Sequence, residues 1–471
     1  MVQGMHRLTR REFLRQAAAS AAAMAAPVVF VPRYARAQQR TLRILAVSHF
    51  VPSFDAWFDP FAERWGRERG VQVVVDHIST AELVPRATAE VAAQQGHDLY
   101  FFDTAPSAFE PHVLDLRDVH QEAERRFGPM LPLVRRSVYN PNTRKFFGFS
   151  DRWILFPGNY LRSVWSAVGM PGGPSTWEDL LRVGNEIKRR FPEIQIPVGI
   201  GFSQDLDSNM AVRALLWSFG ASVQDAQENV VLNGEQTVRA VEFGVRLFRE
   251  VMNPAVLSWN AASNNQALNA RQTSFIINPI SAYRTAQANR LPVADDIFFT
   301  GALRGPRGRW VPGQAAAWVI WRFARSPDLA KEFLLALLDS YRDAVLASRL
   351  YNFPSYPGSV ADARTPVAEK PDAGRRWLRA AVLRDPFESN PADKLRVLAE
   401  AETWSTNVGY PGPANPAEGE ILDTFVLPDM FARAATGRAT PREAVEEAHR
   451  RCVEIFRKWR AQGLVGGGRD R

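Results

Sequence analysis

Alternating strands and amphipathic helices near the start of the chain constrain its fold more than any other sequence feature. Residues 41–48, 71–78 and 98–103 are strand-like, and the last segment is almost continuously apolar, as expected for a buried parallel strand. Between the first two strands, apolar residues recur at the spacing of one helix face: Phe54, Trp57, Phe58, Phe61, Ala62 and Trp65. A second helical segment, 81–95, precedes the third strand, and Gly96 is expected to end it. This order predicts βαβ units with right-handed crossovers in an α/β fold.

The ends of these strands supply the first candidate ligand-binding residues. In open α/β sheets, ligands bind beyond the carboxyl ends of the strands. Ser48 and His49 follow the first strand, and Asp103 and Thr104 come at the end of the third. We therefore predict that these four residues face a ligand.

The segment 145–179 carries the most informative order of elements. An aromatic strand is followed by a second apolar run, 152–160, and by a short helical segment, 161–168. Glycines and prolines stop this helix. Ser175 and Glu178 then fit the S-x-x-E capping box, in which each side chain satisfies an unpaired N–H at the start of the next helix.

This order resembles the first inter-lobe crossing of the family 1 extracellular solute-binding proteins of ABC importers. In that family a strand leaves the first lobe, crosses the cleft and enters the second, and a T-W-E-D-L-like helix start follows. Thr176-Trp177-Glu178-Asp179-Leu180 stands at this place, and the resemblance covers most of the chain after residue 37. It implies a two-lobed periplasmic-binding-protein fold of type II, with a mixed sheet flanked by helices in each lobe and a ligand cleft between the lobes.

The resemblance also implies that each lobe is assembled from separated segments, since the sequence has no internal repeat and no low-complexity linker. Lobe 1 is expected to comprise 41–149 and 295–350, and lobe 2 to comprise 150–294 and 351–462. Within the second lobe, the proline-rich stretch from Tyr351 to Gly358 cannot be helical and is interpreted as another crossing. The C-terminal helices are expected to pack on lobe 2. Residues 463–471 are predicted to be a flexible tail.

The first 37 residues are interpreted as a twin-arginine (Tat) signal peptide. Thr9-Arg10-Arg11-Glu12-Phe13-Leu14 resembles the export motif, and the moderately apolar stretch 17–31 is too short to be a stable membrane span. Ala35-Arg36-Ala37 fits a small-x-small cleavage site. No cysteine lies at the cleavage point, so no lipid anchor is expected. The Tat translocase is therefore a predicted partner, and the periplasm the predicted location.

The net charge is less unusual than the total of +8 suggests. The predicted signal peptide holds six arginines and one glutamate, which leaves +3 for the rest of the chain. No basic run with interleaved aromatics occurs, so nucleic acid is not an expected partner. The single cysteine, Cys452, rules out an internal disulfide and lies on the apolar stripe of a predicted helix, so we expect a monomer.

The sequence contains no recognisable catalytic or cofactor motif. The seven histidines are scattered without H-E-x-x-H spacing, and there is no P-loop, G-x-G-x-x-G or G-x-S-x-G. Asp205-Leu206-Asp207-Ser208-Asn209 matches the start of a calcium loop but lacks its later glycine and glutamate, and capping of the next helix, with a face toward the cleft, is favoured. We therefore predict no metal, no cofactor and no enzymatic activity.

Aromatic residues beside short polar side chains indicate a sugar ligand. The apolar face of a sugar ring packs on aromatic rings, while its hydroxyls need carboxylate and amide partners. The candidate ligand-binding residues are Ser48, His49, Asp103, Thr104, Asp151, Trp153, Asp205, Asn209, Trp259, Asn264, Asn278, Gln314 and Tyr351. For some of them a structural role is the alternative: Asn278 could only end a strand, Gln314 could pair with backbone, and Trp153 could pack the crossing rather than face the ligand.

The sequence thus predicts the substrate-binding protein of an ABC importer, which closes around a carbohydrate and delivers it to an inner-membrane permease. One alternative is a binder of another polar solute, such as a polyamine or a phosphodiester. A second alternative, from a different class, is a Tat-exported carbohydrate hydrolase.

Overall fold

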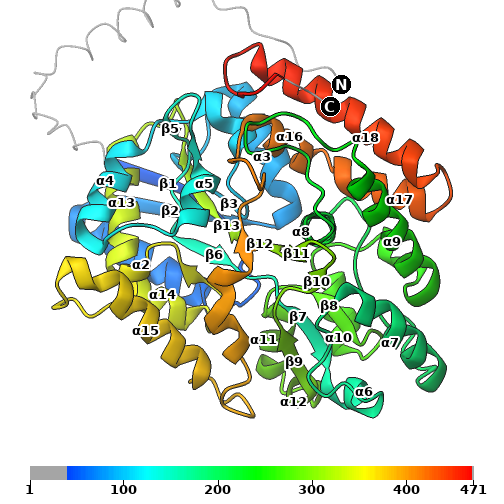
Figure 1. Ribbon diagram of the computed structural model, residues 1–471. Coiled ribbons are helices and arrows are strands. Elements are labelled where there is room, and N and C mark those ends of the chain that lie inside the picture. The colour runs from blue at the N-terminus through cyan, green and yellow to red at the C-terminus, as the bar shows by residue number, and fades with distance from the viewer. Residues whose placement is uncertain (1–39, 469–471) are drawn as a thin grey trace, which may run out of the picture. The chain divides into compact units, whose positions relative to one another are not determined.

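The computed structural model describes residues 40–468 (Figure 1). The predicted signal peptide, residues 1–37, lies outside the described residues, as does the end of the predicted tail from residue 469. Within the described part, no helix is long and apolar enough to cross a membrane.

A four-stranded mixed sheet forms the centre of lobe 1, which we define by this sheet and the helices on it. The strand order is β14-β3-β1-β2. β1 (Arg40–Val47) runs parallel to β2 (Val71–Ile78) and β3 (Leu99–Phe102), and β14 (Ala317–Ile320) is antiparallel to β3. All four residues of β3 are buried, as its continuous apolar sequence predicts. The βαβ prediction is confirmed, and 315–338 returns to lobe 1 as expected.

Helices cover this sheet with the apolar faces that their periodicity predicts. They are α2 (Asp55–Arg69), α3 (Leu83–Ala93), α4 (Arg117–Phe127), α13 (Pro327–Asp339) and α14 (Tyr341–Ala347). Phe58, Phe61 and Trp65 of α2 all place their rings within 5.9 Å of the Phe333 ring of α13. One prediction is wrong: α3 ends with Gln94 in the left-handed conformation, φ 50°, and not at Gly96.

A second sheet defines lobe 2. β7 (Gly158–Leu161) lies between β8 (Phe275–Ile277) and β9 (Ile297–Thr300), and both pairings are antiparallel. Parallel bridges from Ile196 and Gly199 add another extended segment beside β8, so this sheet is also mixed. The helices of lobe 2 are α6 (Arg162–Ala167), α7 (Trp177–Arg190), α8 (Leu206–Ser218), α9 (Glu235–Val251), α10 (Ser263–Asn269), α11 (Ser281–Ala288) and α12 (Val293–Asp296).

Two details of lobe 2 differ from the sequence prediction. β9 was assigned to the lobe 1 segment 295–350, but it pairs with β7 along its whole length. The capping box of α7 begins one residue later than Ser175 and Glu178: Asp179 N donates to Thr176 Oγ1 (3.0 Å), and Thr176 N donates to Asp179 Oδ2 (2.9 Å). Thr-x-x-Asp offers the same reciprocal bonds as Ser-x-x-Glu, and here it places Trp177 in the core.

A three-stranded sheet joins the lobes, and we call it the crossing sheet. β6 (Arg152–Ile154) is its central strand, flanked by β13 (Gln314–Ala315) and β15 (Phe353–Pro354) in antiparallel pairing. β6 precedes the lobe 2 strand β7, and β13 precedes the lobe 1 strand β14. β15 lies in the proline-rich stretch that was interpreted as a further crossing. The sheet therefore collects three separate chain segments at the junction of the lobes.

The C-terminal quarter divides between the lobes. α16 (Pro416–Asp423), α17 (Val426–Ala435) and α18 (Pro441–Arg460) gather beside α8 and α9, and α17 and α18 pack on lobe 2 as predicted (Figure 1). In contrast, α15 (Lys370–Leu383), predicted in lobe 2, packs on the 3-10 helix η4 (Pro357–Val360), which contacts α4 of lobe 1. The predicted capping box of Thr440 and Glu443 is present at the start of α18.

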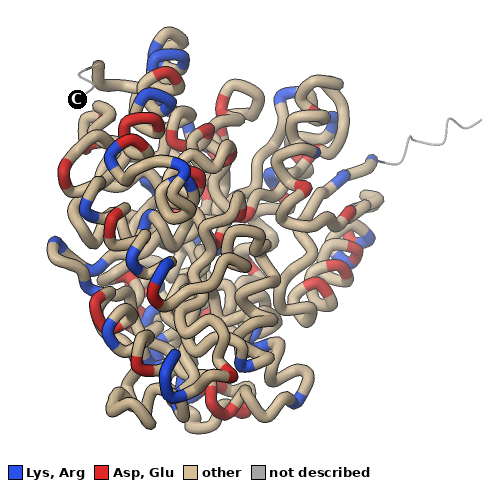
Figure 2. Tube along the Cα trace, turned by 90° about the vertical axis from the view of Figure 1, so that its right-hand side faces the viewer, with Lys and Arg blue, Asp and Glu red and all other residues tan. Residues whose placement is uncertain are grey.

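The described part of the predicted flexible tail, 463–468, is held against the protein. Val465 is buried, and Gly466 N donates to Glu228 Oε2 over 3.0 Å. In the view of Figure 2, Lys and Arg are interspersed with Asp and Glu along the trace. The remaining elements are short: α5 (Pro132–Val138), β4 (Tyr139–Asn140), β5 (Lys145–Phe146), β10 (Arg304–Gly305), β11 (Gly308–Arg309), β12 (Val311–Pro312), β16 (Ser405–Thr406), and the 3-10 helices η1 (Thr80–Glu82), η2 (Ser107–His112), η3 (Pro254–Leu257), η5 (Val367–Glu369) and η6 (Arg396–Thr403).

Candidate ligand-binding site

Asp103 presents a carboxylate at the carboxyl end of β3 in lobe 1. Thr80, just beyond the end of β2, donates its hydroxyl to Asp103 Oδ2 over 2.7 Å. Gln314 of the crossing sheet donates Nε2 to the backbone oxygen of Asp103 over 2.6 Å, so its side chain pairs with backbone, as the alternative prediction allowed. Burial raises the pKa of Asp103, which the Thr80 hydroxyl and the charge of Arg152 partly oppose.

The start of α8 presents two further carboxylates from lobe 2. Asp205 caps the helix, as predicted, and accepts the N–H of Asp207 over 2.9 Å. Asp207 accepts a hydrogen bond from Asn264 Nδ2 over 2.9 Å. Burial, and then the charges of Asp205 and Asp103, raise the pKa of Asp207 well above its usual value. Asp103 of lobe 1 thus contributes to the raised pKa of Asp207 of lobe 2.

An amide network supports Asn264. Its Nδ2 also donates to Asn278 Oδ1 over 3.0 Å, and Asn278 Nδ2 donates to Asn265 Oδ1 over 2.6 Å and to Ser281 Oγ over 3.2 Å. Asn278 is 1% exposed and its side-chain amide bonds to Asn264, Asn265 and Ser281, so it holds Asn264 in position and leaves little of itself for a ligand.

Tyr351 and His49 form the aromatic part of the site. Their ring centres lie 5.0 Å apart, edge to face. Burial and the nearby charge of Arg152 lower the pKa of His49 to about 3, so the ring is neutral at pH 7. Its Nδ1 accepts the N–H of Val51 (3.0 Å), which leaves Nε2–H to donate to Asn352 Oδ1 (3.1 Å).

Charges from both lobes affect the pKa of Tyr351. It is 6% exposed, yet its hydroxyl makes no hydrogen bond within residues 40–468 and is not sealed from solvent. Burial, and then the charges of Asp103 and Asp207, raise the pKa of this phenol well above its usual value. We call Asp103, Asp205, Asp207, Asn264 and Tyr351 the inter-lobe cluster.

Other predicted residues lie at the edge of this cluster or apart from it. Ser48 is exposed and Trp259 half-buried, and the hydroxyl oxygen of Thr104 is buried without a partner in the described chain. Asn209 is fully buried and donates to Leu422 O, so it joins α8 to α16. Asp151 is also fully buried, where it pairs with Arg152 and accepts Trp318 Nε1–H.

Trp153 faces away from the inter-lobe cluster. Neighbouring side chains on a strand point to opposite faces. The guanidinium of Arg152 lies 4.1 Å from the centre of the Phe101 ring, in lobe 1 near Asp103, whereas Trp153 is 2% exposed and packs edge-on against Phe353.

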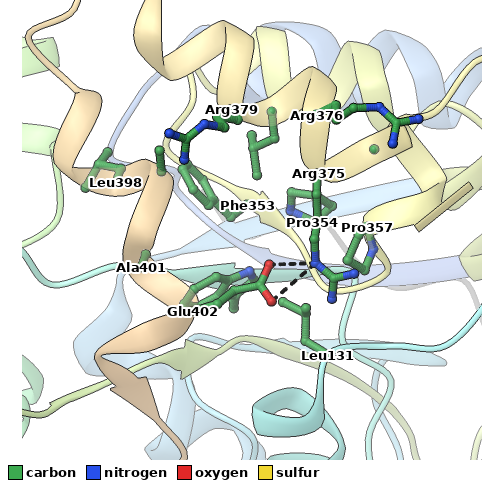
Figure 3. A pocket seen from close by; sticks show the side chains of 14 residues that line it. Leu131, Phe353, Pro354, Pro357, Arg375, Arg376, Arg379, Leu398, Ala401 and Glu402 are labelled. Carbon is green, nitrogen blue, oxygen red and sulfur yellow. Dashed lines mark hydrogen bonds and ion pairs between the residues drawn. The ribbon is translucent and has the colours of Figure 1, made fainter. Parts of the chain in front are cut away.

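On its own side of the crossing sheet, Trp153 lines a cavity of about 250 Å³ together with residues of α15 and η6. Arg375 and Glu402 form an ion pair at this cavity, with Nε–Oε1 3.1 Å (Figure 3). A second cavity of about 480 Å³ lies near it, lined by Thr300, Arg309, Arg379 and Arg396 among others. Neither cavity includes a residue of the inter-lobe cluster.

The sequence prediction missed several residues of the site. Asp207 was predicted to belong to a helix cap with a face toward the cleft, but it was not among the candidate ligand-binding residues. Thr80 follows β2 and could have been found by the strand-end argument that identified Ser48. Asn352 gave no signal, because its contact with His49 joins residues that are 303 positions apart. Within residues 40–468, no three His, Cys, Asp or Glu side chains are arranged to hold a metal ion.

The same fold occurs in solved structures of solute-binding proteins. T. maritima MalE3 with bound maltose is 17% identical, with 88% of this chain and 98% of that chain covered and a TM-score of 0.69. An ABC transporter solute-binding protein from Agrobacterium radiobacter K84 in complex with ribitol is 17% identical (89% and 98% covered, TM-score 0.70). A sugar transporter from Arthrobacter chlorophenolicus A6 with bound laminaribiose is 14% identical (88% and 99% covered, TM-score 0.71).

No curated protein sequence matches the chain. The sequence profile of the bacterial extracellular solute-binding proteins matches residues 51–340, more than half of the chain. This match covers β2, β3, the crossing strands β6 and β13 and the whole sheet of lobe 2. The protein therefore belongs to the bacterial extracellular solute-binding protein family.

Proposed function

We propose that the protein binds a carbohydrate at the inter-lobe cluster and delivers it to an ABC permease. The observation that carries the proposal is the match of residues 51–340 to the bacterial extracellular solute-binding proteins, and the cluster takes Asp103 from lobe 1 and Asp207 from lobe 2. A ligand held there contacts both lobes. The maltose, ribitol and laminaribiose bound to proteins of the same fold support a polyhydroxylated ligand.

The chemistry of the cluster suits hydroxyl groups. Carboxylates accept hydrogen bonds and offer about four lone-pair sites each. Asp103 and Asp207 each have one side-chain donor among the described residues, so both keep capacity to accept sugar hydroxyls. Tyr351 can donate or accept through its hydroxyl, which has no partner among residues 40–468. The half-buried Trp259, five residues before Asn264, is the candidate for the aromatic face on which a sugar ring packs.

Lobe closure about the crossing sheet is the proposed mechanism. A ligand that contacts both lobes favours the arrangement in which both contacts are made. We propose that the lobes move as the bodies defined by their sheets, with β6, β13 and β15 between them. This assigns β9 to lobe 2, so the second crossing follows residue 300.

The remaining parts of the proposal rest on the sequence and on the family. The twin-arginine motif supports export to the periplasm by the Tat translocase, the single buried cysteine supports a monomer, and family membership supports transport in place of catalysis. Among the alternative ligands, a phosphodiester is disfavoured, because the carboxylates of the inter-lobe cluster repel an anion.

Calorimetric titration with neutral mono- and disaccharides, polyols, amino sugars, polyamines and phosphodiesters tests the proposal. We expect one or more of the carbohydrates or polyols to bind, and small-angle scattering at saturation to give a smaller radius of gyration. Asp118→Asn, on the exposed face of α4, should bind equally well. Exclusive binding of a phosphodiester or a polyamine would contradict the carbohydrate assignment, and cleavage of the bound sugar would indicate a hydrolase.

A further inference from the structure

The cavity of about 480 Å³ lies between lobe 2 and the segment that carries α15 and η6. Its lobe 2 wall comes from the loop 172–175 ahead of α7 and from residues 299–302 at the end of β9. The other wall comes from α15 and η6, and α15 packs on η4, which contacts lobe 1. Ligand pockets in proteins are commonly about 300–1,000 Å³, so this cavity has room for a small molecule.

The lining of this cavity has an excess of positive charge. Arg309 comes from β11, which packs on α8 of lobe 2, Arg379 comes from α15, and Arg396 comes from η6 together with Glu400. A guanidinium group stays protonated in proteins, so no change of ionisation removes these three charges. One carboxylate against three guanidinium groups leaves a repulsion that an anion in the cavity offsets.

Two of these arginines have no partner in the described chain. Neither Arg309, which is half-buried, nor the exposed Arg379 makes an ion pair or a side-chain hydrogen bond within residues 40–468. The third, Arg396, contacts Asp393, with Nη1–Oδ2 3.6 Å, in a pair whose side chains are 74% and 46% exposed. Glu400 pairs with none of the three in this part of the chain. The guanidinium donors of the lining are therefore left to water or to a ligand.

The neighbouring cavity provides a direct comparison. There Arg375 donates Nε to both carboxylate oxygens of Glu402, over 3.1 and 3.3 Å (Figure 3). Arg379, one turn further along α15, lines both cavities and extends toward η6 without meeting a carboxylate (Figure 3). The protein thus neutralises one arginine of this helix face and leaves the next one available.

Thr300 gives an observation that does not depend on charge. It lines the same cavity and is 8% exposed, and its Oγ1 is buried without a hydrogen-bond partner in the described chain. A buried hydroxyl normally has a partner, because leaving it unpaired costs free energy. Since residues 40–468 supply none, the acceptor for this hydroxyl has to come from water or from a ligand.

We infer that this cavity binds a compact anion with at least two negative charges, such as phosphate, sulfate or a small polycarboxylate. Arg309 donates to it from the lobe 2 side and Arg379 from α15. Each guanidinium has paired N–H donors that match two oxygens of one phosphoryl, sulfuryl or carboxyl group. A single anion then joins α15 to lobe 2, at a site that shares no residue with the inter-lobe cluster.

Calorimetric titration with inorganic phosphate, sulfate and citrate, at pH 7 in a low-salt buffer, tests the site. We expect at least one of them to bind with one molecule per chain. Arg309→Gln and Arg379→Gln should each weaken that binding about tenfold or more, because each removes a charged bidentate donor. Both variants should melt close to the parent without anion, since neither arginine has an ion pair to lose. Added sodium chloride should weaken the binding by screening the exposed charges.

The matched control is Arg438→Gln. Arg438 is exposed, makes no ion pair within the described chain and lies outside both cavities, so its replacement should leave the affinity unchanged. An equal loss in this control would overturn the inference, because it would show general attraction to a basic surface. Absence of saturable binding of all three anions up to about 10 mM would overturn it as well. Binding of citrate alone would support a carboxylate ligand, and binding of phosphate or sulfate a tetrahedral one. Sugar binding in the same samples reports separately on the proposed function.

Discussion

Arg213 of α8 and Glu418 of α16 form an ion pair, with Nη1–Oε2 2.9 Å, in which the side chains are only 2% and 1% exposed. The pair joins α8 of lobe 2 to α16. Burial raises the pKa of Glu418, and the charge of Arg213 opposes this rise. Nε and Nη2 of Arg213 are buried without a hydrogen-bond partner in the described chain. The guanidinium therefore depends on Glu418 for its counter-charge.

Removing only one member of this pair should be strongly destabilising. Glu418→Ala is expected to lower the free energy of unfolding by about 3–5 kcal/mol, because it leaves the guanidinium buried without a counter-charge. Urea denaturation measures the loss. The double variant Arg213→Met with Glu418→Leu should recover most of it, since two apolar side chains leave no uncompensated charge. A double variant as unstable as the single one would show that the pair matters by packing alone.

The stability of lobe 1 should depend on pH through His97. This side chain is 2% exposed, and its ring nitrogens contact Glu90 Oε1 (2.6 Å) and Asp76 Oδ2 (2.9 Å). Burial lowers the pKa of His97, but the hydrogen bonds and charges of Glu90 and Asp76 outweigh burial and raise it overall. A raised pKa in the folded state stabilises the protein below the unfolded value of about 6.5 and loses this contribution as pH rises through the folded value.

Urea denaturation between pH 5.5 and 8.5 measures this dependence. The free energy of unfolding should fall with rising pH more steeply in the parent than in His97→Gln. The matched control is His112→Gln. Burial lowers the pKa of His112, and the charges of Lys145 and Arg322 add to that effect, so its contribution to stability has the opposite pH dependence. His112→Gln should therefore not reduce the fall in the free energy of unfolding with rising pH. Parallel pH profiles for the parent and His97→Gln would contradict the expected contribution of His97.

Local sequence patterns predicted much of the fold, and non-local pairing accounts for the main errors. Continuous apolar residues identified β3, and Asp103 follows its carboxyl end, where the strand-end argument predicted a ligand-facing residue. The segment 297–300 is equally strand-like, but no local signal tells whether it pairs with lobe 1 or with β7. Asp207 was not among the candidate residues for a similar reason, because the local pattern indicates a helix cap and the effect of Asp103 on its pKa comes from the other lobe.

Cys452 should be unreactive in the folded protein. It is fully buried in α18, and burial, with the charge of Glu418, raises the pKa of its thiol. Only the thiolate reacts readily with disulfide reagents. Ellman's reagent should therefore titrate the thiol only after unfolding, and the elution volume on a sizing column should not change with reductant. Rapid labelling of the native protein, or a dimer that reductant dissociates, would be inconsistent with this burial.

Export should depend on the paired arginines. Arg10 and Arg11 precede Phe13-Leu14 in the predicted Tat motif. Replacing both arginines by lysine keeps the positive charge but removes the residue type that the motif specifies, so the precursor is expected to remain in the cytoplasm. Cell fractionation measures the distribution, with Arg7→Lys as the control. Normal periplasmic amounts of the double variant would point to another export route.

The role of Trp153 can now be stated more sharply than the sequence allowed. Its position in the crossing sheet suggested either stacking on the ligand or packing. Because its ring lies against Phe353 and lines the cavity beside α15, on the face opposite Arg152, we expect packing to dominate. Trp153→Ala should lower the free energy of unfolding by about 3–5 kcal/mol, as for other large buried aromatics.

Ligand affinity separates the two roles. If Trp153 only packs the crossing sheet, folded Trp153→Ala protein should bind the ligand with nearly parental affinity, measured by calorimetry at a temperature well below its melting point. Trp153→Phe keeps an aromatic ring in the same place and should recover part of the lost stability. A large loss of affinity with little loss of stability would instead place the indole against the ligand, which would require the side chain to turn to the other face of the crossing sheet when the lobes close.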